Sequence, residues 1–165
     1  MSIDPARALQ RSIAVAQLDV PTFEEVEADY TSTDEAGAVV VAASAIGAIG
    51  GLFSNGLWGL IAFLLIQLIG WFVWAWLSAY IAERVFEVQT TDTSEMLRTT
   101  GYAYGPRVIG IIPWIGWIIG FVWSVIAIVV GMREAAELST TQAVITTLIG
   151  ILPATIAMVI VMSIL

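Results

Sequence analysis

Carboxylates are the side chains of this sequence with the clearest capacity for chemistry. Fourteen Asp and Glu residues stand against six Arg, and the chain contains no His, Cys or Lys. The absence of His and Cys excludes the commonest general base, thiolate nucleophiles, and imidazole or thiolate metal sites. An acidic chain without Lys is also a poor ligand for nucleic acid, whose affinity comes from neutralised phosphates.

The acids lie outside the apolar parts of the chain. Eight of them fall in residues 1–35, and the others lie in 83–95 and 134–137. The acids near Glu24 lack the glycine turn and ligand spacing of a calcium loop. A membrane hydrolase needs a carboxylate pair, a Ser with a base, or a metal, and neither Ser44 nor Ser124 has a Lys or His available. We therefore expect no catalytic residue, no metal and no cofactor.

The elements that position these residues are long apolar stretches. The chain of 165 residues is 59% apolar and 12% charged, with a mean hydropathy of +0.91. Uncharged runs cover 36–82, 108–132 and 138–165, and about 20 apolar residues suffice for a helix to cross a bilayer. The predicted fold is an all-α polytopic membrane helical bundle, in which 1–35 form a cytoplasmic amphipathic head and 36–165 a transmembrane domain.

Two short helices are predicted in the head. Asp4 before Pro5 is typical of a helix start, and Arg7 and Arg11 share one face of the helix that follows. This helix either lies on the membrane with its arginines at lipid headgroups or is a partly ordered tail. After Pro21, Thr22 and Glu25 show the capping-box pattern of a second, acidic helix. Its acids either recruit a basic partner or form a solvated face.

The first span is predicted to begin at a second capping box, formed by Ser32 and Glu35. Small residues recur at Ala43, Gly47 and Gly51, which favours close packing on the second helix of the same chain, with packing between chains as the alternative. An uncharged turn is expected at 54–56.

The second span is predicted over 57–81, where only Gln67 is polar at mid-depth. Trp71, Trp74 and Trp76 cluster near its end, as in the aromatic belts of membrane interfaces. A capping signal at Asp92 and Glu95 predicts a short helix ending near Gly101.

Two layouts fit the next apolar stretch. If 113–116 is a turn, it separates a short third span, which includes 102–112, from a fourth span over 117–132. The chain then has five spans, and all arginines face the same side of the membrane. If 108–131 is one continuous span, there are four spans and Arg133 lies outside. Charge favours five spans and length favours four.

Ser139 and Gln142 form a last capping box, ahead of a final span over 143–165. Pro153 is expected to kink that span.

The later half of the chain contains a set of motifs, which are Gly101-Tyr102-Ala103, Pro106, Pro113, Gly131-Met132-Arg133-Glu134-Ala135, Leu138-Ser139 and Ala143. With these motifs the chain resembles the Yip domain family. The segment Pro21-Thr22-Phe23-Glu24-Glu25-Val26 ahead of the first span resembles the prokaryotic branch of that family. The resemblance implies five membrane helices, a cytoplasmic N-terminus and a C-terminus outside. Eukaryotic members bind lipidated Rab GTPases and carry an Asp-Leu-Tyr-Gly-Pro signature before the first span. This chain has Thr33-Asp34-Glu35-Ala36-Gly37 there instead, so the resemblance does not extend to Rab binding.

The predicted function is that of a non-catalytic membrane scaffold or adaptor, or an accessory subunit of a larger membrane complex such as a respiratory or photosynthetic one. Expected partners are the lipid bilayer, other membrane subunits, and a bound lipid or carotenoid, in a prokaryotic inner membrane. The alternative is a small transporter or channel for a neutral or lipidic substrate, motivated by the prolines that interrupt the helices. The predicted partner-binding residues are Phe23, Glu24, Glu25, Tyr102, Tyr104, Pro106, Arg107, Arg133 and Glu134.

Overall fold

The computed structural model describes residues 3–49, 52–88, 92–112 and 115–164, and every regular element within these ranges is helical. The helices in chain order are α1 (Pro5–Ala16), α2 (Val20–Ala28), α3 (Thr33–Ile49), α4 (Leu52–Val85), α5 (Thr93–Tyr102), the 3₁₀ helix η1 (Gly105–Ile111), α6 (Gly116–Ala135) and α7 (Thr140–Ile164). The predicted all-α fold class is confirmed.

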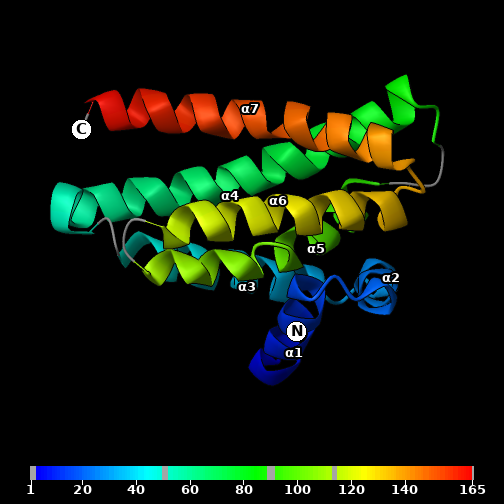
Figure 1. The fold of residues 1–165 in the computed structure, drawn as a ribbon, viewed down its shortest axis with the longest axis horizontal. Coiled ribbons are helices and arrows are strands. Elements are labelled where there is room, and N and C mark those ends of the chain that lie inside the picture. Colours follow the sequence, from blue (N-terminus) through cyan, green and yellow to red (C-terminus); the bar gives the residue numbers. More distant parts are fainter. Residues whose placement is uncertain (1–2, 50–51, 89–91, 113–114, 165) are drawn as a thin grey trace.

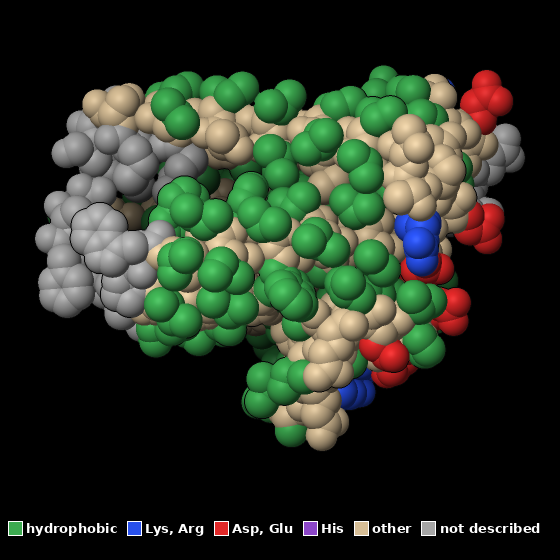
Figure 2. All heavy atoms as spheres, in the orientation of Figure 1, with side chains coloured by type: hydrophobic (Ala, Val, Ile, Leu, Met, Phe, Trp, Pro, Cys, Tyr) green, Lys and Arg blue, Asp and Glu red, His purple; other side chains and the backbone are tan. Residues whose placement is uncertain are grey.

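The long helices run back and forth between two ends of an elongated bundle (Figure 1). α4 packs on α7, α6 packs on η1 and α7, and α3 lies against η1, α4 and α5. α1 and α2 sit at the side of the bundle near the end where α4 and α6 finish. The charged side chains in view gather at that same end, whereas the exposed flank of the bundle is largely hydrophobic (Figure 2).

Three stretches of the described chain are long and apolar enough to cross a membrane, at 57–85, 116–135 and 140–157. Their exposed surfaces carry large apolar side chains such as Ile69, Phe72 and Ile126, which only lipid or another membrane protein can cover favourably. The chain is therefore an integral membrane protein.

The chain reverses direction between η1 and α6. A Cβ added at Gly116 would lie 2.1 Å from the carbonyl oxygen of Ile109, and one at Gly120 would lie 2.9 Å from that of Pro106. Such pairings require η1 to fold back along α6, so 108–131 is not one continuous helix. Residues 113–114 of the predicted turn lie outside the described part of the chain. The segment before the reversal is divided into α5 and η1.

Several predicted helix boundaries are confirmed. Asp4 caps α1, with Pro5 in its first turn, and Asp92 and Glu95 form the capping box of α5. Ser139 and Gln142 bond reciprocally at the start of α7, where the backbone N–H of Ser139 donates to Gln142 Oε1 at 2.9 Å. These three signals each depend on groups only a few residues apart.

Other local predictions were wrong. Residues 54–56 lie inside α4 instead of forming a turn, because a helix satisfies its own backbone groups where water is scarce. The start of α2 is capped by Asp19, whose carboxylate accepts from the backbone N–H of Thr22 at 3.2 Å. Trp71 and Trp74 are buried in the bundle instead of marking an interface, and only Trp76 of that cluster is half exposed.

Small residues permit the closest contacts between helices. A Cβ added at Gly110 of η1 would lie 3.3 Å from Gly47 Cα, so the small-residue face of α3 meets η1 there. α3 also packs on α4, the partner that the sequence predicts. The predicted contact of Gly51 lies outside the described residues. α4 and α7 approach each other at Gly70 and Gly150, where an added Cβ would meet Ala154 at 2.8 Å and Trp74 at 2.1 Å. Pro153 lies within α7, which is helical on both sides of it.

Candidate functional site

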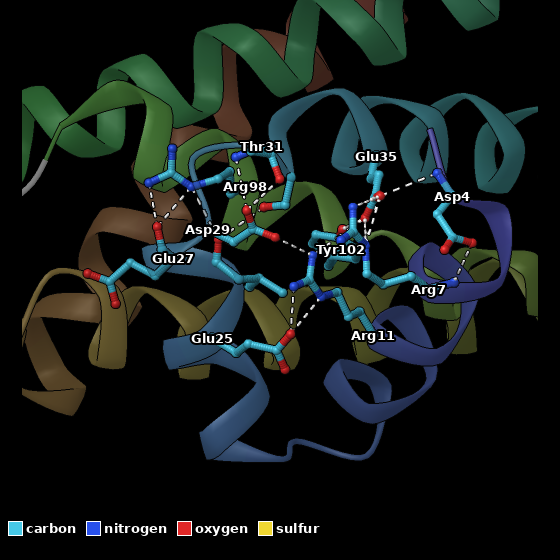
Figure 3. A network of polar contacts seen from close by, with 12 residues as sticks. Asp4, Arg7, Arg11, Glu25, Glu27, Asp29, Thr31, Glu35, Arg98 and Tyr102 are labelled. Atoms are coloured by element: carbon cyan, nitrogen blue, oxygen red, sulfur yellow. Dashed lines mark hydrogen bonds and ion pairs between the residues drawn. The ribbon is translucent and has the colours of Figure 1, made fainter. Parts of the chain in front are cut away.

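A buried carboxylate, Glu35, joins the head to the bundle (Figure 3). Glu35 lies in the first turn of α3 and is 1% exposed. Arg7 donates to its carboxylate from Nε at 3.0 Å and from Nη2 at 2.5 Å, and the Tyr102 hydroxyl of α5 donates at 3.0 Å. The expected capping box of Ser32 and Glu35 is not formed, because these longer-range donors take the carboxylate.

Arg11 ties three elements of the head together. Its side chain is buried, and its guanidinium bonds Glu25 of α2 at 2.5 Å, Asp29 after α2 at 2.8 Å, and Glu35 of α3 at 3.4 Å. A buried guanidinium is stable only when acceptors surround it, and three carboxylates meet that need. The arginine face of α1 therefore points toward the other head residues and not toward lipid headgroups.

The ion pairs also shift the pKa values of the head carboxyls. Hydrogen bonds from Thr31 and Arg11 outweigh burial and lower the pKa of Asp29 to about 2. Burial by itself would raise the pKa of Glu35, but the hydrogen bonds from Arg7 and Tyr102 hold it below its usual range. Both carboxyls are thus ionised at neutral pH, as the pairing with Arg7 and Arg11 requires.

A second buried arginine, Arg98 of α5, binds the end of α2. Arg98 is 1% exposed and donates from Nε to the backbone carbonyls of Glu27 at 2.9 Å and Val26 at 3.2 Å. Its guanidinium carbon also lies 5.0 Å from the centroid of the Tyr30 ring. The last carbonyls of a helix carry partial negative charge and lack helical partners, so a cation there stabilises the helix end.

Acidic side chains surround Glu27 on the outer side of this contact. Burial, with the nearby charge of Glu95, raises the pKa of Glu27 to about 7, although Arg98 opposes the shift. Glu24 and Glu137 add to the repulsion. This carboxyl therefore titrates near neutral pH, unlike Asp29.

The predicted partner-binding residues fall into buried and exposed sets. The buried residues hold the head against the helices, and they are Phe23, Tyr102, Tyr104 and Pro106. A Cβ added at Gly131 of α6 would lie 3.0 Å from the Phe23 ring, which shows how closely α2 meets α6. The exposed or partly exposed set consists of Glu24, Glu25, Arg107, Arg133 and Glu134.

The exposed members do not form one contiguous ion-pair network. Glu25 is engaged by Arg11, whereas Arg133 pairs with its neighbour Glu134 at 2.5 Å near the end of α6. Arg107 lies in η1, with its guanidinium carbon 3.8 Å from the Tyr104 ring centroid and 5.5 Å from that of Phe121. Its Nε has no hydrogen-bond partner among the described residues.

Sequence reasoning missed the residues that organise this end, which are Arg7, Arg11, Glu35 and Arg98. The spacing of Arg7 and Arg11 on one helix face was recognised, but their partner Glu35 was assigned to a cap. The last acid before an apolar run is the signal that points to it, because such a carboxylate needs cations once it is buried. Within the described ranges no group of three acids is placed to hold a metal ion.

Comparison with protein families decides the relationship of the chain. The family model described as the Yip1 domain matches residues 21–164. The chain belongs to the Yip1 domain family. The match begins within α2 and runs through α7, so the Yip1 domain contains Glu35, Arg98 and Tyr102, while Arg7 and Arg11 lie in the segment before it. No curated protein and no solved structure matches the chain.

Proposed function

We propose that this Yip1 domain protein is a non-catalytic membrane scaffold or adaptor, with its partner-binding surface at the charged end of the bundle. The observation that carries the proposal is that the buried charges are paired within the protein. Glu35, Arg11 and Arg98 are all engaged in contacts that hold the head to the bundle. Those groups have a structural role, which leaves the exposed acids and arginines of the same end available to partners.

The proposed topology has five transmembrane helices, with the N-terminus in the cytoplasm and the C-terminus outside a prokaryotic inner membrane. The reversal between η1 and α6 supports it, because it supplies the additional pass that the four-span layout lacks. The charge distribution supports it too: Arg84 and Arg133 lie in the last turns of α4 and α6, at the end where the head is held. Arginines near span ends favour the cytoplasmic side.

The partners we propose are other membrane protein subunits, with a bound lipid or carotenoid as a further component. Arg133 and Glu134 are the best-placed residues to contact a subunit, since they lie at the end of α6 outside the head network. We predict that Arg133→Ala or Glu134→Ala lowers partner recovery several-fold without reducing insertion. The measurement is co-purification from native membranes in mild detergent, followed by mass spectrometry.

The chain offers a matched control for this experiment. Glu83 and Arg84 are also sequence neighbours in the last turn of a long helix, and their exposed side chains approach to 3.8 Å. Arg84→Ala should leave partner recovery unchanged. Equal losses for Arg84→Ala and Arg133→Ala would indicate a general charge effect, and normal recovery with both α6 variants would show that this surface does not bind the partner.

A further inference from the structure

The first helix of the head is amphipathic in an unusual orientation. Its polar and small residues face inward, where Ala8, Arg11, Ser12 and Val15 are buried. Its large apolar side chains face outward: Leu9 is 61% exposed and Ile13 is 49% exposed. Leu9 and Ile13 are four residues apart and share one side of the helix, whereas Gln10 is turned by about 100° from Leu9 around the helix axis.

The outward apolar side of α1 is continuous with the flank of the bundle. The indole Nε1 of Trp123 in α6 donates to the carbonyl oxygen of Ala16 at 2.7 Å, and a Cβ added at Gly105 of η1 would meet Ser12 Oγ at 2.1 Å. The neighbouring surfaces of α6 and η1 are exposed and apolar at Val122 and Val108. Exposed apolar surfaces of this kind on a membrane-spanning bundle favour contact with lipid, so α1 borders a surface suited to the bilayer.

The direction of α1 suits the same environment. In Figure 1 its axis crosses the long helices steeply, as the axis of a helix lying in the membrane surface must. Figure 2 shows hydrophobic side chains on the side of the protruding α1 region that faces along the apolar flank, and acids with an arginine on its opposite side. Trp123 lies beside α1 on α6, and tryptophan is typical of the headgroup level.

We propose that α1 lies in the membrane interface, with Leu9 and Ile13 in the acyl-chain boundary and Gln10 toward water. The apolar side makes the contact with lipid, because Arg7 and Arg11 are occupied by Glu35 and its neighbours. Anionic lipid is therefore not required, unlike in helices that bind through basic side chains. This inference is independent of which partner binds the charged end.

The test uses single cysteines, since the chain has none of its own. Full-length Leu9→Cys, Ile13→Cys and Gln10→Cys proteins are labelled with a nitrobenzoxadiazole fluorophore and placed in phosphatidylcholine nanodiscs. Doxyl-labelled lipid should quench the labels at 9 and 13 several-fold more than the label at 10. Iodide in the water should give the reverse order.

Each alternative outcome overturns the proposal. Strong iodide quenching at all three positions would place α1 in water, and protection of positions 9 and 13 from both quenchers would indicate a protein partner on that side. The measurement is repeated with 30% phosphatidylglycerol, and the quenching pattern should not change. If labels 9 and 13 enter lipid only in the anionic discs, the arginines bind headgroups and the apolar contact is not the cause.

Discussion

The head junction and the interior of the long-helix bundle are held together by different kinds of contact. At the junction, buried charges meet several partners each, as Glu35 and Arg98 show. In the bundle, the hydroxyls of Ser44, Ser124 and Thr146 are buried without a hydrogen-bond partner among the described residues. Buried charges are thus paired across helices at the junction, whereas several buried hydroxyls of the bundle have no partner among the described residues.

Close packing replaces polar pairing inside the bundle. At Gly150, a Cβ would lie 2.1 Å from Trp74 Cδ1, so the α7 backbone touches the indole ring directly. In a membrane, helices associate through such contacts, because lipid tails are as apolar as the side chains they would replace. The comparison teaches that charge deletion should break the head junction, whereas added volume should break the bundle.

The largest effect is expected from Glu35→Gln. The substitution leaves Arg7 and Arg11 without their shared carboxylate, and breaking a buried pair costs about 3 kcal/mol or more. Head docking should weaken by about 3 kcal/mol, because Arg11 keeps Glu25 and Asp29. Hydrogen exchange of α1 and α2 measures this loss, and Asp34→Asn, at an exposed neighbouring position, should change exchange little. Unchanged protection in the Gln variant would show that apolar contacts hold the head.

The next largest effect is expected from Gly150→Ala. The added methyl collides with Trp74, whose ring is enclosed, and overpacking of this kind costs about 1–3 kcal/mol. Gly37→Ala is the matched control, since its Cβ would lie 3.6 Å from the Trp71 ring in ordinary contact. Unfolding in a denaturing detergent, followed by tryptophan fluorescence, should separate the two variants. Similar stability for both would mean that α4 and α7 are not closely packed there.

A pH effect sharpens the comparison within the head. The pKa of Glu27 is raised from 4.5 to about 7, so its contribution to stability is complete below pH 4.5 and is lost as pH rises through 7. Glu27→Gln should therefore strengthen head docking at pH 8 by about 1 kcal/mol, allowing for solvent screening, and by nothing at pH 4.5. Hydrogen exchange at both values measures it, with Asp34→Asn as the control at an exposed head carboxyl. The pKa of Asp29 is lowered to about 2, so its contribution to the stability of the head changes only in acidic solution.

The smallest effect is expected from Thr146→Val. The buried hydroxyl of Thr146 has no partner among the described residues, and replacing such a group by an apolar one is neutral or stabilising by up to about 1 kcal/mol. Thr147→Val removes a hydroxyl that donates to Met132 Sδ at 3.3 Å and should be destabilising instead. Detergent-induced unfolding compares the two neighbours. A clear loss with Thr146→Val would reveal a polar partner for that hydroxyl.

Local chemistry made much of the fold predictable from sequence. The uncharged runs identified the long helices, and Asp92 with Glu95 identified the start of α5, because capping partners lie within one turn of each other. Capping was misassigned where a competitor intervened. Asp19 caps α2 in place of Thr22, and Glu35 bonds Arg7, 28 residues away.

The head junction could not be predicted because its partners are distant along the chain. Arg98 meets the carbonyl of Val26 across 72 residues, and Tyr102 meets Glu35 across 67. Periodicity places each of these side chains on a helix face, but it does not say which faces meet. The reversal between η1 and α6 was indicated by the arginine distribution and not by span length, because orientation in a membrane depends on charge.

The long reach of Arg98 and Tyr102 has a consequence for biosynthesis. A ribosome makes α1 and α2 first, yet their two anchors in α5 emerge only after the whole of α4 has been translated. Until then α1 and α2 lack their contacts with α5, whereas Arg7 and Arg11 can already form ion pairs with Glu35. The head can therefore dock completely only after α3 and α4 have packed together and α5 has folded against them.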